Sequence, residues 1–204
     1  CQAYQIIWAA YGNDAQRVAR PRLPRPSEAL ARAAIKACED ANPAPGQMHP
    51  STLAAAYARF GDGDGVERSM SRDPRSPPVV RLETALLLHD LDSAAQVADH
   101  AIGTIESGAR LRFAALRVQI IQEASDNGRA DLVRLLANRA LEDVGAIDSP
   151  HADALSPSVE ALVRLDREAA ALYIPRLDAR ARDTSSQASL TAAVAAVRGW
   201  VALG

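Results

Sequence analysis

Apolar residues recur every three or four positions along most of the chain, which is the spacing of one face of an α-helix. Before residue 77, this pattern predicts helices over residues 27–41 and 51–60. From residue 77 onwards, it predicts helices over 79–90, 91–106, 110–125, 129–144, 159–165, 166–182 and 187–203. The pattern therefore predicts an all-α fold.

The composition argues against a β-sheet. Forty-three of the 204 residues are alanine, which has the highest helix propensity of the amino acids. Aromatic residues, which favour strands, make up only 4% of the chain. We therefore expect packed antiparallel helices and no sheet.

Three of the predicted helices begin alike, with Leu91-Asp92, Ala130-Asp131 and Leu165-Asp166. The three aspartates are 39 and 35 residues apart. A period near 35–40 residues indicates an array of stacked helical hairpins, an α-solenoid. Residues 27–204 are accordingly predicted to form one helical-repeat domain, and residues 1–26 an N-terminal helix and a strap rich in proline and arginine.

Two segments resemble known α-solenoid families. The first segment resembles a HEAT repeat and consists of Pro77-Pro78-Val79-Val80-Arg81-Leu82-Glu83-Thr84-Ala85 followed by Leu91-Asp92. The second segment resembles the turn of a tetratricopeptide repeat and consists of Leu53-Ala54-Ala55-Ala56-Tyr57 followed by Phe60-Gly61-Asp62. The resemblance covers about residues 51–183. It implies a scaffold that binds proteins or peptides on a concave face.

The last predicted helix carries four large apolar residues on one face, at spacings of four, three and four: Leu190, Val194, Val197 and Val201. We expect this face to dock on the preceding hairpin. On that hypothesis Val197→Asp would detach the helix, whereas Arg198→Ala would be tolerated because Arg198 lies about 100° round the helix from Val197.

The first residue, Cys1, carries a second resemblance. A mature bacterial lipoprotein begins with the cysteine that bears its lipid. The resemblance implies a lipid on Cys1 and attachment to the periplasmic face of the bacterial outer membrane, because Gln2 is not the Asp that retains such proteins at the inner membrane. The competing hypothesis is a Cys1–Cys38 disulfide in a secreted form without lipid. Without such a bond, Cys38 is expected to be a small buried residue.

The N-terminal 26 residues hold the candidate contact residues for a membrane or a protein partner. Three aromatic residues share one face of a predicted helix, and four arginines lie in or just before the proline-rich strap. The alternatives are a helix that caps the first repeat and a solvated strap. The candidates are Tyr4, Trp8, Tyr11, Arg17, Arg20, Arg22 and Arg25.

No motif in the sequence indicates a metal or a cofactor. The four histidines lack the spacing of a metal site, and no phosphate-binding or nucleophile-elbow motif occurs. The loop from Gly61 to Gly65 fails as a calcium site, because Val66, Glu67 and Asp73 occupy positions that an EF-hand gives to a ligand, glycine and glutamate. We expect this loop to be a flexible turn.

The charge of the chain excludes a general affinity for nucleic acid, since the net charge is −2. The carboxylates are expected on solvated helix faces with arginine partners four residues away.

The preferred functional hypothesis is a lipid-anchored accessory or scaffold subunit of a bacterial cell-envelope assembly, which acts by binding proteins. The alternative is a soluble helical-repeat interaction module that belongs to a larger protein. A third hypothesis is an enzyme whose site is assembled from residues scattered along the sequence.

Overall fold

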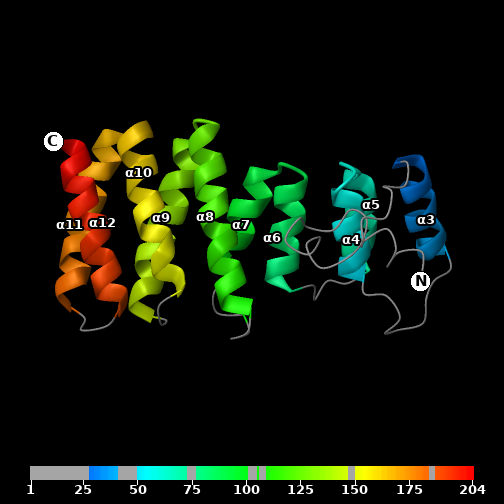
Figure 1. The fold of residues 1–204 in the computed structure, drawn as a ribbon, viewed down its shortest axis with the longest axis horizontal. Helices are drawn as coiled ribbons and strands as arrows, with labels where there is room; N and C mark the ends of the chain where they lie inside the picture. Colours follow the sequence, from blue (N-terminus) through cyan, green and yellow to red (C-terminus); the bar gives the residue numbers. More distant parts are fainter. Residues whose placement is uncertain are drawn as a thin grey trace, which may run out of the picture. The chain divides into compact units, whose positions relative to one another are not determined.

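The computed structural model describes residues 28–40, 50–72, 77–100, 105, 109–146, 150–183 and 187–204 (Figure 1). Within these ranges 89% of the residues are helical, in ten α-helices and one 3-10 helix, and no strand occurs. The all-α prediction is confirmed. The chain divides into two compact units, Cys1–Ser76 and Pro77–Gly204.

The first unit contains α3 (Glu28–Asp40), α4 (Pro50–Ala58) and α5 (Gly63–Ser71), with α4 in contact with both neighbours. The prediction of a flexible turn at residues 61–65 is wrong, because α5 begins inside it. The Asp62 side chain accepts a hydrogen bond from the Gly65 N–H at 2.9 Å and caps this helix. Gly65 also lies against the Tyr57 ring, which a Cβ at that position would overlap.

The second unit is a two-layer array of helical hairpins (Figure 1). In one layer α6, α8, α10 and α12 contact each other in turn, and in the other α7, α9 and α11 do so. This is the α-solenoid arrangement that the period predicts. The elements are α6 (Pro78–Leu87), α7 (Leu91–His100), α8 (Arg110–Asp126), α9 (Ala130–Ala146), η3 (Pro150–Ala154), α10 (Leu155–Leu165), α11 (Arg167–Asp183) and α12 (Gln187–Leu203).

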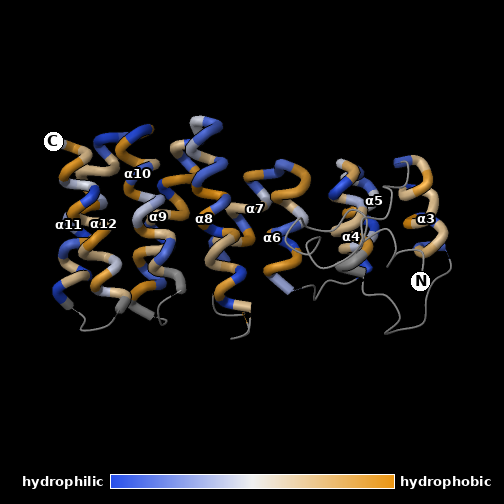
Figure 2. The backbone as a smooth tube through the Cα atoms, viewed as in Figure 1, coloured by the Kyte–Doolittle hydropathy of each residue, from blue (hydrophilic) through white to orange (hydrophobic). Residues whose placement is uncertain are grey.

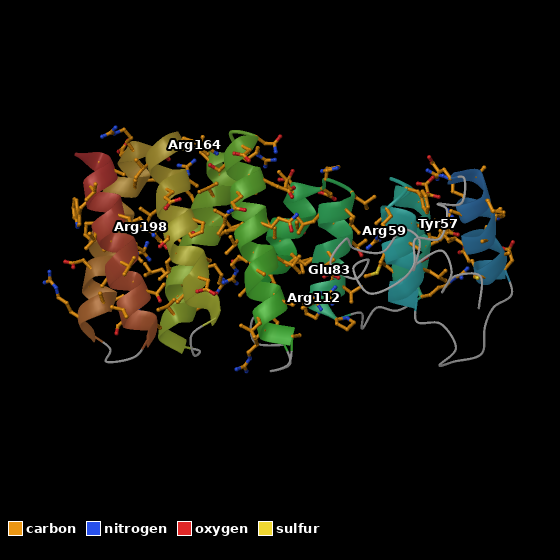
Figure 3. The ribbon with its side chains drawn as sticks, in the orientation of Figure 1. Tyr57, Arg59, Glu83, Arg112, Arg164 and Arg198 are labelled. Atoms are coloured by element: carbon orange, nitrogen blue, oxygen red, sulfur yellow. The ribbon has the colours of Figure 1, made fainter. Side chains whose placement is uncertain are left out.

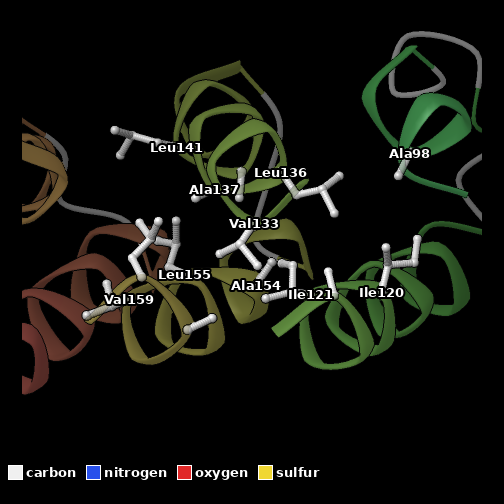
Figure 4. Packing of buried hydrophobic residues seen from close by; sticks show 14 of the residues in the cluster. Ala98, Ile120, Ile121, Val133, Leu136, Ala137, Leu141, Ala154, Leu155 and Val159 are labelled. Atoms are coloured by element: carbon white, nitrogen blue, oxygen red, sulfur yellow. The ribbon is translucent and has the colours of Figure 1, made fainter. Parts of the chain in front are cut away.

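One hydrophobic cluster runs between the layers of the second unit. In Figure 4, Ile120 and Ile121 of α8 lie near Val133 and Leu136 of α9, and Leu155 of α10 follows. All five side chains are fully buried. Each contributes about 1.5–3 kcal/mol on leaving water, so this cluster holds the hairpins together. Figure 2 shows hydrophobic residues in each of these helices.

The helix starts of the second layer show the repeat directly. Asp90 before α7 and Asp166 before α11 each accept a hydrogen bond at 3.0 Å from the backbone N–H three residues further on. Arg129 holds the equivalent place before α9. These positions are 39 and 37 residues apart. The repeat is therefore present, but Asp90, and not Asp92, is the residue equivalent to Asp166.

Arginine side chains join successive helices within each layer. Their N–O distances are 2.6 to 3.3 Å, and the partners are 38 or 40 residues apart, which is one repeat. The prediction of pairs four residues apart is confirmed at Arg32–Glu28 and Arg182–Asp178. It is wrong for the side chains that join hairpins, because their partners belong to the next hairpin. Figure 3 labels Arg164 and Arg198. The pairs are Arg139–Asp99, Arg164–Asp126, Arg176–Asn138 and Arg198–Glu160.

Candidate protein-binding surfaces

The last helix, α12, exposes its large hydrophobic residues. Leu190, Val194, Val197, Trp200 and Val201 are between 44% and 78% exposed. At 100° per residue, they lie on the side of the helix opposite the array. The prediction that this face docks on the preceding hairpin is wrong. We call these five residues the outer face of α12.

The side of α12 that packs on the array is made of small residues. Ala192, Ala195 and Ala196 are buried there. A Cβ added at Gly199 would lie 2.7 Å from Ile174 of α11 and from Val159 of α10. The helix therefore approaches its neighbours too closely for leucine or valine, which explains why the large residues face outward.

Two arginines near α12 have partners within the array. The only charged residue of this helix, Arg198, lies 3.3 Å from the Glu160 carboxylate of α10. Near the end of the helix, Arg167 Nη2 donates to the Leu203 carbonyl oxygen at 2.6 Å. The outer face itself is uncharged, so a partner has to offer an apolar surface.

A groove with a volume of about 400 Å³ lies between α9 and α11. Tyr173 lines it and donates its hydroxyl proton to the Ala137 carbonyl oxygen at 2.8 Å. Burial raises the pKa of this tyrosine. Leu172 also lines the groove and is 69% exposed. The groove therefore offers an apolar side chain beside a buried, already satisfied hydroxyl.

The charges along this groove balance one another. Arg134 Nη1 lies 3.3 Å from the Asp166 carboxylate, and Arg176 donates to the Asn138 amide oxygen at 2.6 Å. Glu168 adds a second carboxylate to the lining. With two arginines and two carboxylates, the groove does not select strongly for the charge of a ligand.

A second groove, of about 330 Å³, lies between α8 and α10. Arg164 lines it and donates to the Ser125 hydroxyl and, at 2.9 Å, to the Asp126 carboxylate. Glu160, another lining residue, is the partner of Arg198. Its main charged groups are thus already engaged in joining successive hairpins.

A charged pair lies in the core of the second unit. Arg117 of α8 is fully buried, and its Nη1 donates to Asp143 of α9 at 2.6 Å. Its Nη2 donates to the Ala98 carbonyl oxygen of α7 at 3.1 Å, and its guanidinium lies 5.4 Å from the centre of the Phe113 ring. Arg117 Nε has no hydrogen-bond partner. The guanidinium therefore ties three helices together at one point.

Burial opposes the charged forms of this pair. It lowers the pKa of Arg117 and raises the pKa of Asp143, while their mutual attraction acts in the opposite direction for each. The sequence pattern did not predict this pair, because carboxylates in general were expected on solvated helix faces. The available signal was the position of Arg117 in line with Phe113, Ile120 and Ile121 on one helical face.

The first unit also holds a buried carboxylate. The Tyr57 hydroxyl donates to Glu39, and Arg72 Nη2 lies 3.2 Å from the same carboxylate. Burial and the hydrogen bond to Glu39 raise the pKa of Tyr57 to about 12. The arrangement joins α3, α4 and the end of α5, which indicates a structural role.

Cys38 is buried in α3, as predicted, but it is disulfide-bonded, whereas the lipoprotein hypothesis leaves it unpaired. The sequence contains one other cysteine, Cys1, so a disulfide within a single chain requires Cys1 as the partner. A lipid thioether would use the same sulfur atom, and the two hypotheses for Cys1 therefore exclude each other. Cys1 lies outside the described residues, and its lipidation stays a prediction.

The other predicted contact residues also lie outside the described part of the chain. They are Tyr4, Trp8, Tyr11, Arg17, Arg20, Arg22 and Arg25. Among the residues that are described, no group of three or more histidine, cysteine or carboxylate side chains is placed to hold a metal ion. The described helices include none that is both long and apolar enough to cross a membrane.

Comparison of the chain with protein-family models, with curated proteins and with solved structures finds no match. Its function has to be inferred from its own surfaces. Within the described residues, the outer face of α12 holds more exposed large apolar side chains than any other helix.

Proposed function

We propose that this chain is a scaffold or accessory subunit that binds protein partners through the outer face of α12. The observation that carries the proposal is the arrangement of α12, which buries its small residues and exposes its large apolar ones. Burial of apolar surface is favourable by about 25 cal/mol per Å². Exposed clusters of apolar side chains of this kind mark interaction sites in soluble proteins.

The position of α12 supports the proposal. With α11 it lies at one end of the array in the second unit (Figure 1). There it packs on α10 and α11, with its alanine residues buried and its large apolar residues exposed. An exposed apolar face of this kind is suited to a contact with another protein.

The groove between α9 and α11 is a second contact surface in this proposal. Leu172 provides an apolar contact there. Arg134 and Arg176 line the same groove and can donate hydrogen bonds to a polar segment of a partner. Because the charges balance, this groove adds contact area and not selectivity.

We also place this scaffold outside the reducing cytoplasm, in a bacterial cell envelope. The support is the disulfide at Cys38, since disulfides persist in oxidising compartments such as the periplasm. The lipoprotein resemblance implies instead a lipid on Cys1 and attachment to the outer membrane, and this form cannot also contain a Cys1–Cys38 disulfide. The soluble-module alternative expects the same protein contacts and no lipid.

The binding proposal is tested by cross-linking in the cell. A photoreactive amino acid at position 197 is expected to cross-link to protein, because Val197 is 61% exposed on the outer face. Leu111 of α8 is 73% exposed and serves as the matched control position. If position 197 yields no more protein cross-links than position 111, the proposal is wrong.

The state of Cys1 is tested by the intact mass of the natively extracted protein. A mass increased by two or more acyl chains supports lipidation, because a single chain anchors only weakly. The mass of the bare polypeptide less two hydrogens, restored by reduction, identifies the disulfide and excludes the thioether.

A further inference from the structure

Helix α7 packs on its neighbours through small side chains. Its fully buried residues are Ala94, Ala95 and Ala98, while Leu91 and Val97 contact the core only in part. Large side chains fix the position of a helix along its axis because they interlock with those of the next helix, and methyl groups interlock less. The neighbouring helix α9 buries large side chains: Leu132, Val133, Leu136, Leu141 and Val144. Apolar packing therefore constrains the axial position of α7 less than that of α9.

A buried guanidinium recognises the end of α7. Arg117 Nη2 of α8 donates to the Ala98 carbonyl oxygen at 3.1 Å, and α7 ends shortly afterwards, at His100. The last four carbonyl groups of a helix generally have no partner within that helix, and the helix dipole favours a positive charge beside them. This bond therefore defines one position of α7 relative to α8.

The guanidinium is itself held in place. Arg117 Nη1 donates to Asp143 of α9 at 2.6 Å, and the side chain is fully buried. A shift of α7 by one turn, about 5.4 Å, would bring a carbonyl group that already accepts a bond within the helix opposite Arg117 Nη2. Any smaller shift would leave this buried donor without an acceptor, which is unfavourable.

Two further arginine links hold α7, and both are partly exposed. Arg139 Nε donates to Asp99 at 2.8 Å, and Arg129 Nη2 donates to Asp92 at 2.6 Å. Both arginine side chains are about one-third exposed. Exposed ion pairs contribute little, and long side chains can follow a carboxylate that moves. The buried bond from Arg117 is therefore the contact that depends most on the position of α7.

We propose that the buried pair of Arg117 and Asp143 sets the position of α7 along its axis and so selects one packing arrangement of the α6–α7 hairpin on α8 and α9. The turn at residues 88–90 joins α6 to α7, so the two helices move together. A buried polar pair in this role specifies one arrangement without adding stability, since apolar replacements often pack as stably. This role is separate from protein binding, which involves α12 and the groove between α9 and α11.

Spin-label distances in the full chain test this role. One label at Ser93, near the start of α7, and one at Ala179, near the end of α11, give a distance that changes by a few ångströms if α7 shifts by one turn. Both positions are exposed, and labels carried by non-natural amino acids leave the cysteines unchanged. The wild type is expected to give a single narrow distance distribution.

Two variants remove the constraint in different ways. Arg117→Met/Asp143→Leu replaces the pair by apolar side chains and is expected to give a second distance or a broadened distribution in a folded chain. Arg117→Lys keeps a positive charge opposite Asp143, but its compact ammonium lacks the fork that reaches both acceptors, so it should broaden the distribution too. Leu82→Ala is the control, because it removes a fully buried side chain of α6 and leaves the pair intact. The control should lower the stability and keep the wild-type distance.

A single wild-type distance in either folded variant of the pair would overturn the proposal. Equal broadening by Leu82→Ala would also overturn it, because apolar packing would then set the position of α7. Circular dichroism verifies that each variant is folded. If the double variant does not fold, the distance distribution of Arg117→Lys decides the question alone.

Discussion

Helices α8 and α12 belong to the same layer, but α8 buries a charged side chain whereas α12 exposes its large apolar ones. Four α-helices and the η3 segment contact α8, which buries a guanidinium at Arg117. Among the described elements, α10, α11 and η3 make the main contacts with α12, which exposes Trp200 and four aliphatic side chains. Burial of a side chain in this array thus depends on the neighbouring elements as well as on the residue type.

The two helices meet different physical limits. In α8, transfer of a charge from water is unfavourable, and the carboxylate of Asp143 offsets part of that cost. In α12, close approach to Ile174 and Val159 limits the size of the inner residues. The first limit is electrostatic and the second is steric, so they respond to different substitutions.

The largest expected effect comes from breaking the buried pair in the array interior. Asp143→Leu leaves the Arg117 guanidinium buried without its counter-ion and should lower the free energy of unfolding by about 3–5 kcal/mol. Chemical denaturation of the full chain measures this loss. The double variant Arg117→Met/Asp143→Leu should recover most of it, because both charges are then absent. A loss as large in the double variant would contradict the electrostatic explanation.

The next effect tests the steric limit at α12. Gly199→Ala places a Cβ against Ile174 and Val159 and should cost about 1–3 kcal/mol through overpacking. Gly63→Ala in α5 is the matched control, because a Cβ there meets no atom within 4 Å. The control should be neutral or slightly stabilising. Similar melting temperatures for the two variants would show that α12 is not held tightly.

A smaller effect is expected at the exposed ion pairs that join neighbouring hairpins. Arg129 bonds both Asp92 and Asp131 and lowers the pKa of Asp131 to about 2, from an ordinary value of 3.8. A lowered pKa means that the stabilisation is present above about pH 4 and is lost as the pH falls through about 2. Carboxyl NMR titration measures this pKa, which Arg129→Ala should return towards 3.8. An unchanged pKa in the variant would exclude Arg129 as the cause.

The smallest effect is expected at the outer face itself. Val197→Asp should change the free energy of unfolding of the monomer by no more than about 0.5 kcal/mol, since the side chain already contacts water. Ala196→Asp, one residue earlier on the buried side, should destabilise the protein strongly because it buries an unpaired charge. Thermal melts at low protein concentration compare the two. If Val197→Asp proved more destabilising than Ala196→Asp, Val197 would belong to the core after all.

The periodicity of the sequence was sufficient for the helices and for their stacking. Alanine-rich segments with apolar residues every three or four positions predicted helices whose bounds agree closely with α8, α9 and α12. The recurrence of aspartate near helix starts predicted a period that the structure shows at Asp90, Arg129 and Asp166. Helix formation and repeat length depend on local pattern, so a single sequence contains enough information to infer both.

Only the tertiary structure decided which side of each helix is buried and which charges meet. Periodicity identifies the face with Val194 and Val197, but α12 also has a face of alanine and glycine, and only the close approach of α10 and α11 selects the latter. Likewise, the burial of Arg117 depends on Asp143, which lies 26 residues away on another helix. Burial and pairing are set by neighbours in space, whereas the pattern along the chain sets only the helices that carry them.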